Sequence, residues 1–260
     1  MGIFTTVLVQ PILNLLVWLY DVVPGRDIGV AIILLTFIVK LLLYPFTVAQ
    51  IKQQRALQEL QPKIDEIRAR LKDNKEEQAK ELMALYGKEK VNPAASCLPL
   101  LIQLPVFIAL YSALKLALNS QLGLLYPFIP DPQSISPLFM GFIPLNGIGY
   151  TNGTFSLAPA LLAVLAGAIQ FVQTRQILKP PAATVMTPPP DVVNTAEAKD
   201  ESMATMMNKQ MSYIMPIMTI FIGMGLPAGL TLYWLVMSLF TVVQQAITLK
   251  RLPPKIEPQL

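Results

Sequence analysis

A lysine lies inside an apolar stretch that is long enough to cross a lipid bilayer. The stretch is residues 29–50, GVAIILLTFIVKLLLYPFTVAQ. In a helix rising about 1.5 Å per residue, Lys40 is roughly 18 Å from Ile28 and roughly 12 Å from Val48. A hydrocarbon core is about 30 Å thick, and a lysine at such depth costs on the order of 2.5–3.5 kcal/mol. The alternative is that the long Lys40 side chain snorkels to the headgroups.

Polar residues share the Lys40 side of the predicted helix. The spacing i, i+4, i+8, i+11 places on one face Thr36, Lys40, Tyr44 and Thr47. A similar stripe in the last apolar run contains Trp234, Ser238, Thr241 and Gln245. Gln103 and Gln170 lie in two further runs. Such residues either line a shared cavity or bond helices to one another. No acidic residue lies in any predicted span, so helix-to-helix bonding alone explains Lys40 badly.

The composition is typical of an integral membrane protein. Of the 260 residues, 53% are hydrophobic and 14% are charged, and several apolar runs approach span length. The chain has no His, which is the commonest general base and metal ligand, and the single Cys97 excludes an internal disulfide. The motifs HExxH, GxSxG and GxxxxGK[ST] are absent as well. We therefore expect no enzymatic activity, no cofactor and no metal site.

The apolar runs predict an all-α integral membrane protein with five transmembrane helices. The predicted spans are residues 28–50, 96–118, 157–178, 208–226 and 227–249. Between and around them we expect an N-terminal interfacial helix on the outer face (1–27), a cytoplasmic hairpin (51–95), an extracytoplasmic loop (119–156), a flexible cytoplasmic loop (179–207) and a cytoplasmic tail (250–260). Ten of the twenty Lys and Arg lie between Lys52 and Lys90, and residues 119–156 contain none. The positive-inside rule then places the N-terminus outside and the C-terminus in the cytoplasm.

The first 27 residues allow two interpretations. Pro11 and Asn14 interrupt the apolar run, and no Lys or Arg precedes Arg26, so the run lacks the basic region of a signal peptide. We expect a helix lying on the membrane surface with Trp18 and Tyr20 at the headgroups. A sixth span is the alternative.

The charged segment after the first span carries two apolar stripes. The first, with coiled-coil spacing, consists of Leu57, Leu60, Ile64, Ile67 and Leu71. After a polar turn at residues 72–75, the second consists of Ala79, Leu82 and Tyr86. Together they predict an antiparallel helical hairpin, kinked by Pro62. This hairpin is either a docking arm for partners or a solvated link between two spans.

Three stretches resemble the YidC/Oxa/Alb family of membrane protein insertases. They are TFIVKLLLYPFTVAQ with LQELQPKI, VNPAASCLPLLIQLPVFIALY, and MPIMTIFIGMGLPAGLTLYW. The resemblance covers Ile28 to Leu249 and implies five helices around a hydrophilic groove that is open to the cytoplasm and lipid but closed outside. By motif position it places in that groove Lys40, Thr36, Gln103, Gln170 and Trp234. Tyr44 and Ser238 join them from the polar stripes.

Two departures from the family pattern concern the groove cation and the chain ends. Lys40 stands where the family usually has an Arg, which holds its charge almost anywhere and presents a planar fork to a carboxylate. We expect neither a large extracytoplasmic domain nor a lipoprotein-type Cys near the start, and the short, mildly basic tail weakens ribosome docking through it.

The resemblance implies an insertase and chaperone for nascent membrane proteins in the bacterial plasma (inner) membrane. Its partners would be nascent membrane proteins and the lipid bilayer, with the ribosome, targeting factors and the Sec translocon as further candidates and no direct nucleic-acid binding. A small-solute transporter using Lys40 as an anion site is one alternative, but it predicts internal inverted repeats that the sequence lacks. A non-catalytic assembly scaffold acting through the hairpin is another, and it leaves the intramembrane stripe unexplained.

Overall fold

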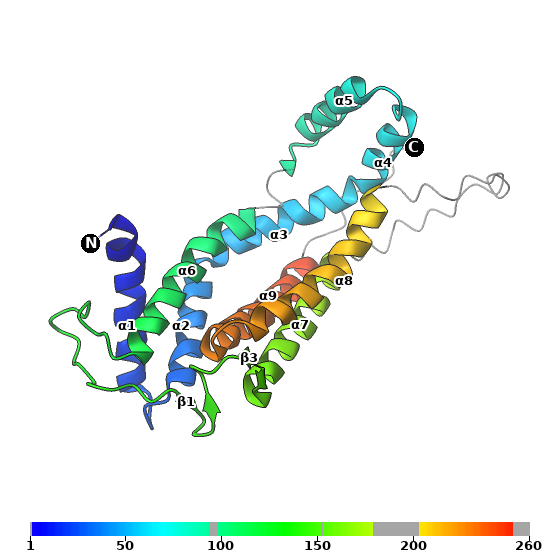
Figure 1. Cartoon of the computed structure of the whole chain (residues 1–260). Coiled ribbons are helices and arrows are strands. Elements are labelled where there is room, and N and C mark those ends of the chain that lie inside the picture. The colour runs from blue at the N-terminus through cyan, green and yellow to red at the C-terminus, as the bar shows by residue number, and fades with distance from the viewer. Residues whose placement is uncertain (1, 94–97, 152, 179–202, 252–260) are drawn as a thin grey trace.

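The computed structural model describes residues 2–93, 98–151, 153–178 and 203–251. A π-helical turn, Thr5–Val9, leads into α1, and the α-helices are α1 (Gln10–Val22), α2 (Ile28–Leu42), α3 (Tyr44–Glu59), α4 (Gln61–Arg70), α5 (Lys75–Lys88), α6 (Leu98–Leu118), α7 (Leu157–Leu178), α8 (Met203–Met224) and α9 (Ala228–Arg251). Two short antiparallel pairs join β1 (Leu138–Phe139) to β2 (Ile143–Pro144) and β3 (Tyr150–Thr151) to β4 (Thr154–Phe155). Figure 1 shows α1, α2 and α6 side by side, with α7, α8 and α9 as a second group.

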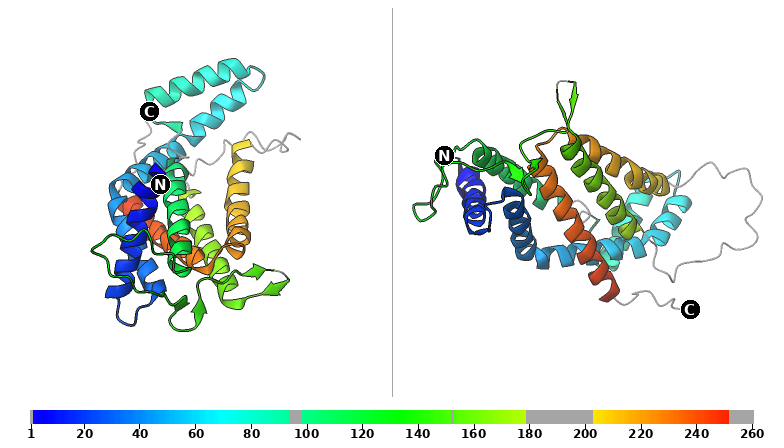
Figure 2. Two further views of the ribbon diagram at one scale, coloured as in Figure 1. Left: turned by 60° about the vertical axis from the view of Figure 1, so that its left-hand side comes forward. Right: turned by 90° about the horizontal axis from the view of Figure 1, so that it is seen from below.

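The two ends of the helical bundle differ, and we name them by what they carry. The loop between α6 and α7, with its short strands, lies at the loop end (Figure 1). The α4–α5 hairpin projects from the opposite side, which we call the hairpin end; it stands clear of the other helices in Figure 2 as well.

The first predicted span, residues 28–50, is broken. The helix α2 ends at Leu42, α3 begins at Tyr44, and the two are bent by 66°. Pro45, in the first turn of α3, explains the break, because it lacks an N–H and its ring clashes with the preceding turn. Lys40 therefore lies in the last turn of a helix rather than in the middle of one. This corrects the prediction of one continuous helix.

The N-terminal helix differs from the expected surface helix. Thr5–Val22 is long and apolar enough to cross a membrane, and the helix contacts α2 and α6 along its length. Its protein-facing side is apolar, because Leu13, Leu16, Val17 and Tyr20 recur with helical spacing and are buried. These features agree with the sixth-span alternative better than with the interfacial prediction.

The other predicted spans agree with the helices of the structure to different degrees. Three helices have a stretch of membrane-crossing length and hydropathy, namely α6 over Leu101–Leu118, α7 over Leu157–Gln176 and α9 over Ala228–Arg251. The pair α2 and α3 passes the same test together, whereas the apolar stretch found in α8 is the shorter Tyr213–Met224. The helix α8 begins at Met203, ahead of the predicted residue 208.

An antiparallel hairpin of α4 and α5 follows the break at Leu60. Pro62 stands in the first turn of α4, so it begins a helix instead of bending one. The side chain of Asn74 caps α5 by accepting from the backbone N–H of Glu77 at 3.2 Å. A small apolar cluster joins the two arms, with Leu60, Ile64 and Val91 buried and, packed against them, Ala56, Leu57, Leu82, Leu85 and Tyr86.

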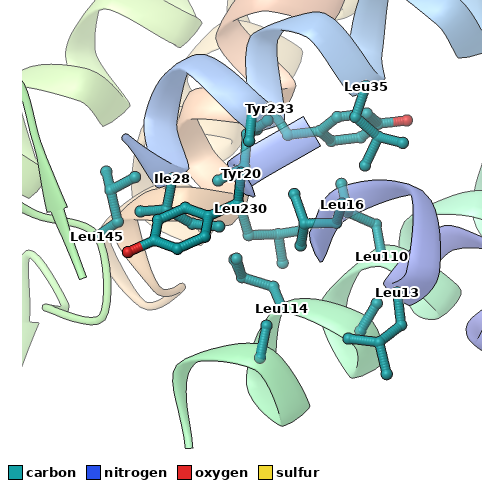
Figure 3. Close-up of a cluster of buried hydrophobic side chains, with 14 of the residues drawn as sticks. Leu13, Leu16, Tyr20, Ile28, Leu35, Leu110, Leu114, Leu145, Leu230 and Tyr233 are labelled. Carbon is teal, nitrogen blue, oxygen red and sulfur yellow. The ribbon is translucent and has the colours of Figure 1, made fainter. Parts of the chain in front are cut away.

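One large apolar cluster holds the loop end together (Figure 3). Four helices and the α6–α7 loop contribute fully or almost fully buried side chains, among them Leu13, Leu16, Ile28, Leu35, Leu110, Leu114, Leu145, Leu230 and Tyr233. Between membrane helices, close van der Waals packing of such side chains, rather than their removal from water, stabilises the cluster. The loop end is thus the stable, dry part of the bundle.

Asn14 of α1 and Asp27, which precedes α2, hold the α6–α7 loop over this cluster by hydrogen bonds. Asn14 donates from Nδ2 to the carbonyl of Leu124 at 2.9 Å, and its Oδ1 accepts from the N–H of Tyr126 at 2.6 Å. Asp27 caps α2 through the N–H of Gly29 at 2.8 Å and also accepts from the N–H of Met140 at 2.6 Å. These bonds give hydrogen-bond partners to backbone groups of the loop, including the N–H groups of Tyr126 and Met140.

Some predicted segments lie outside the described residues. These are Cys97, residues 179–202 of the expected flexible loop and residues 252–260 of the expected tail. Residues 203–207, which were predicted to belong to that loop, are helical and form the start of α8.

Candidate functional site

Buried polar side chains gather where α2 meets the hairpin-end half of α9. We call this set the polar seam; its buried members are Lys40, Ser238, Gln244, Gln245 and Thr248, and the half-buried Thr241 lies among them. Four of its members share one face of α9, since residues 238, 241, 245 and 248 follow helical spacing. Contacts between α2 and α9 bring Lys40 onto this face. The seam is the part of the bundle where polar groups replace the apolar cluster.

The charge of Lys40 is the most costly feature of the seam. Its side chain is only 7% exposed, and Nζ donates to Oγ1 of Thr241 at 2.7 Å. That hydroxyl donates onward to the carbonyl of Met237 at 2.9 Å. Among the described residues no carboxylate forms an ion pair with Lys40. The only partner that we find for the ammonium group is therefore neutral.

Helix geometry offsets part of this cost. Lys40 lies in the last turn of α2, where the negative end of the helix dipole favours a cation. That effect contributes typically 0.3–1 kcal/mol, which is less than the roughly 2.5–3.5 kcal/mol cost of a lysine at bilayer depth. The remaining cost makes the site receptive to an anion, because a carboxylate would supply the missing counter-charge.

Two further predicted residues tie α6 to α9. Gln103 donates from Nε2 to the hydroxyl oxygen of Tyr233 at 2.7 Å. Trp234 makes an edge-to-face contact with Phe107, with ring centroids 5.9 Å apart. The side chains of Trp234 and Phe107 are both half-buried. Ser238 is buried one helical turn before Thr241.

Three predicted residues are not brought to the Lys40 amine. Thr36 is fully buried and its hydroxyl donates to the carbonyl of Ile32 at 2.6 Å, so the hydroxyl is committed to its own helix. Tyr44 lies beyond the helix break, half-exposed, and is linked to α9 only by its carbonyl, which accepts from Gln244 at 3.5 Å. Gln170 lies half-buried on α7. Lys40 itself is covered, and the open groove around it stays a prediction.

Sequence reasoning missed Tyr233 and the pair Arg55–Glu59. Tyr233 stands next to Trp234 but off the polar stripe, and no periodicity marks it. Arg55 donates from Nε to Oε1 of Glu59 at 2.9 Å and from Nη1 to the carbonyl of Leu249 at 3.0 Å. The available signal was the opposite charges at i and i+4, which were hidden among the many charges of the segment. In the part of the chain that the structure describes, no cluster of His, Cys, Asp and Glu suited to a metal is found.

Comparison with known proteins gives one consistent result. Residues 18–255 match the family model described as 60Kd inner membrane protein. Curated relatives named Membrane protein insertase YidC include one from Vibrio cholerae, 34% identical over 92% of this chain, and one from Brucella melitensis, 33% identical over 95%. Another from Mannheimia succiniciproducens is 32% identical over 92%. The chain spans only 36% to 37% of the length of these relatives.

Proposed function

The chain belongs to the 60Kd inner membrane protein (YidC/Oxa1) family, and on that basis we propose that it is a membrane protein insertase and chaperone. The helices of membrane-crossing length and the YidC relatives support a multi-pass protein of the bacterial inner membrane. In this proposal the polar seam receives the hydrophilic segment of a nascent membrane protein while the neighbouring apolar segment moves into lipid. Neither nucleotide nor metal takes part.

The observation that carries the proposal is the uncompensated charge of Lys40. A purely structural cation at this depth is expected to have a carboxylate partner, because an unpaired buried charge is strongly destabilising. The partner of Lys40 is the hydroxyl of Thr241, and no carboxylate of the described residues forms an ion pair with it. A substrate carboxylate that arrives from outside the chain completes the pair. Retaining this costly group is understandable if it serves the substrate.

The asymmetry of the bundle supports entry from the hairpin end. The apolar cluster and the fastened loop close the loop end. The hairpin end carries the ten Lys and Arg between residues 52 and 90, and the positive-inside rule assigns it to the cytoplasm, where nascent chains are made. The C-terminus then lies inside, whereas the N-terminus lies outside with an interfacial first helix and inside with Thr5–Val22 as a sixth span. A polar segment therefore enters the seam from the cytoplasm and meets a closed outer end.

Substrate entry requires α2 and α9 to separate, because Lys40 is covered. The contact that must be exchanged is the bond from Lys40 to Thr241. A hydrogen bond that involves a charged group contributes about 1.5–3 kcal/mol. The bond to Thr241 already has a charged donor, and a substrate carboxylate adds the opposite charge that the neutral hydroxyl cannot supply. The exchange is therefore favourable once the substrate is present.

Site-specific crosslinking tests this proposal. A photoreactive amino acid at Thr241 should crosslink to the polar segment of a ribosome-stalled membrane protein, because that segment is proposed to occupy the seam. The matched control is the same probe at Leu165, an exposed position on α7, which should react with lipid or with the apolar segment instead. Equal crosslinking of the polar segment at both positions would contradict the proposal.

A further inference from the structure

A small cavity lies between α3 and α9, next to the polar seam and toward the hairpin end. It has a volume of about 10 Å³, which is roughly the space of one water molecule, and its lining consists of Ile51, Gln54, Arg55, Gln58, Gln245 and Leu249. Gln245 is only 3% exposed, and its Oε1 has no hydrogen-bond partner among the described residues. A buried acceptor without a donor is costly. The cavity thus offers an unused acceptor to any group that brings an N–H.

A cation stands beside this acceptor and is neutralised from within the chain. The guanidinium of Arg55 donates to Glu59 at 2.9 Å and to the last-turn carbonyl of Leu249 at 3.0 Å. The two side chains of the pair are only 15% and 8% exposed, so solvent screens their attraction less than on an open surface. Glu59 comes from the same helix as Arg55. The arginine that lines the cavity is therefore already paired with a carboxylate of its own helix.

The cavity and the Lys40 site lie along the same face of α9. Thr241, which bonds Lys40, is followed along α9 by Gln245 and Leu249 at intervals of four residues. Residues at i and i+4 lie one above the other on a helix, and eight residues rise about 12 Å. Arg55 thus lies about two turns of α9 beyond Lys40, on the hairpin side. A chain that moves from the hairpin end to Lys40 passes Arg55 first.

We propose that the Arg55–Gln245 cavity is an entry subsite for acidic polar segments of nascent membrane proteins. A substrate Asp or Glu displaces the Glu59 carboxylate from Arg55, and a substrate backbone N–H donates to Oε1 of Gln245. The carboxylate then advances along α9 to Lys40. Glu59 acts as an internal competitor that keeps Arg55 neutralised when no substrate is present. This inference rests on the proposed insertase function.

A structural latch is the competing explanation, since Arg55 and Glu59 also tie α3 to the end of α9. The two explanations predict opposite effects for Glu59. If the pair is only a latch, Glu59→Gln weakens α3 docking and lowers insertion of every substrate. If Glu59 is a competitor, Glu59→Gln raises insertion of acidic substrates relative to neutral ones, whatever both lose because the buried Arg55 lacks its partner.

The experiment measures insertion of two matched single-span substrates by the full chain in proteoliposomes. The substrates differ only by Asp or Asn in the translocated segment. Arg55→Gln should lower insertion of the Asp substrate about tenfold and that of the Asn substrate less than twofold, whereas Arg55→Lys should restore part of the loss. The control Arg68→Gln removes an arginine from an exposed pair with Asp65 and should change neither.

Several results would overturn the subsite. Equal losses on both substrates in Arg55→Gln and in Glu59→Gln would leave only a latch. If the unmodified chain inserts neither substrate, the proposed function itself fails, which distinguishes that failure from failure of the subsite alone.

A crosslink provides a second test that does not depend on the folding of Arg55→Gln. In a Cys97→Ser background, Gln245→Cys should form a disulfide with a Cys placed beside the substrate Asp. The yield should fall when that Asp is Asn. No disulfide with the Asp substrate would also overturn the subsite.

Discussion

The loop end of the bundle is held together by apolar buried side chains, whereas the polar seam at the hairpin end buries polar ones. At the loop end, side chains such as Leu16 and Leu230 are fully buried in an apolar cluster, and the overlying loop is fastened by hydrogen bonds from Asn14 and Asp27. At the hairpin end the buried groups are an ammonium, hydroxyls and amides. The first arrangement stabilises the fold. The second is costly, and its cost is understandable only if it serves a substrate.

The free energies involved support this contrast between the two ends. Truncating one buried leucine of the loop end costs about 2–5 kcal/mol because it leaves a cavity, and Figure 3 shows several such side chains packed together. Lys40 costs on the order of 2.5–3.5 kcal/mol at bilayer depth. A few of the buried leucines therefore offset the charge. Changes at the loop end should mainly alter stability, and changes at the hairpin end should mainly alter substrate handling.

The largest expected loss of stability is at the loop end. Leu16→Ala should lower the free energy of unfolding by about 2–5 kcal/mol, because it leaves a cavity in the apolar cluster. The measurement is reversible unfolding in detergent followed by circular dichroism. Val22→Ala, at an exposed position of the same helix, is the matched control and should change the value by less than about 0.5 kcal/mol. Equal effects of the two changes would remove the contrast between the ends.

A smaller stability effect is expected at the single bond of Lys40. Thr241→Val should destabilise the protein by about 1.5–3 kcal/mol, since it removes the hydroxyl that accepts from the ammonium group. The same change in a Lys40→Leu background should cost clearly less, and a double-mutant cycle measures the difference. A coupling energy near zero would mean that the bond from Lys40 to Thr241 contributes nothing to the folded state.

Gly29→Ala tests the contact between α2 and the loop. A Cβ at Gly29 would overlap the ring of Phe139, and overpacking of this kind costs about 1–3 kcal/mol. The α6–α7 loop should then become more accessible to protease added from the loop side. Gly87→Ala, in α5, meets nothing within 4 Å and should stabilise the hairpin by up to about 1 kcal/mol. Unchanged protease resistance in Gly29→Ala would contradict this close packing.

Sequence patterns predicted the helical membrane class, because long apolar runs and the distribution of Lys and Arg are strong signals. The polar stripe of α9 was also visible, and its member Thr241 proved to be the partner of Lys40. The break at Leu43 was missed because a proline inside an apolar run is compatible with a continuous membrane helix. Only the tertiary packing decides between a broken and a continuous helix.

Sequence patterns did not predict which partner each side chain contacts. Thr36 shares a face with Lys40, yet its hydroxyl bonds to the carbonyl of Ile32, a local choice that threonine often makes in helices. The pair Arg55–Glu59 resembled any other surface pair of a charged segment, and its burial depends on where α9 ends. Helical spacing identifies a face but does not identify the partner across it.

The cationic role of Lys40 can be measured directly with the same matched substrates. Lys40→Leu should leave the stability of the isolated protein unchanged or higher, because a costly charge is removed, and Lys40→Arg should work at least as well as the native chain. Insertion of the Asp substrate by Lys40→Leu should fall about tenfold, while insertion of the Asn substrate should fall less. Equal insertion of both substrates by Lys40→Leu would contradict the account.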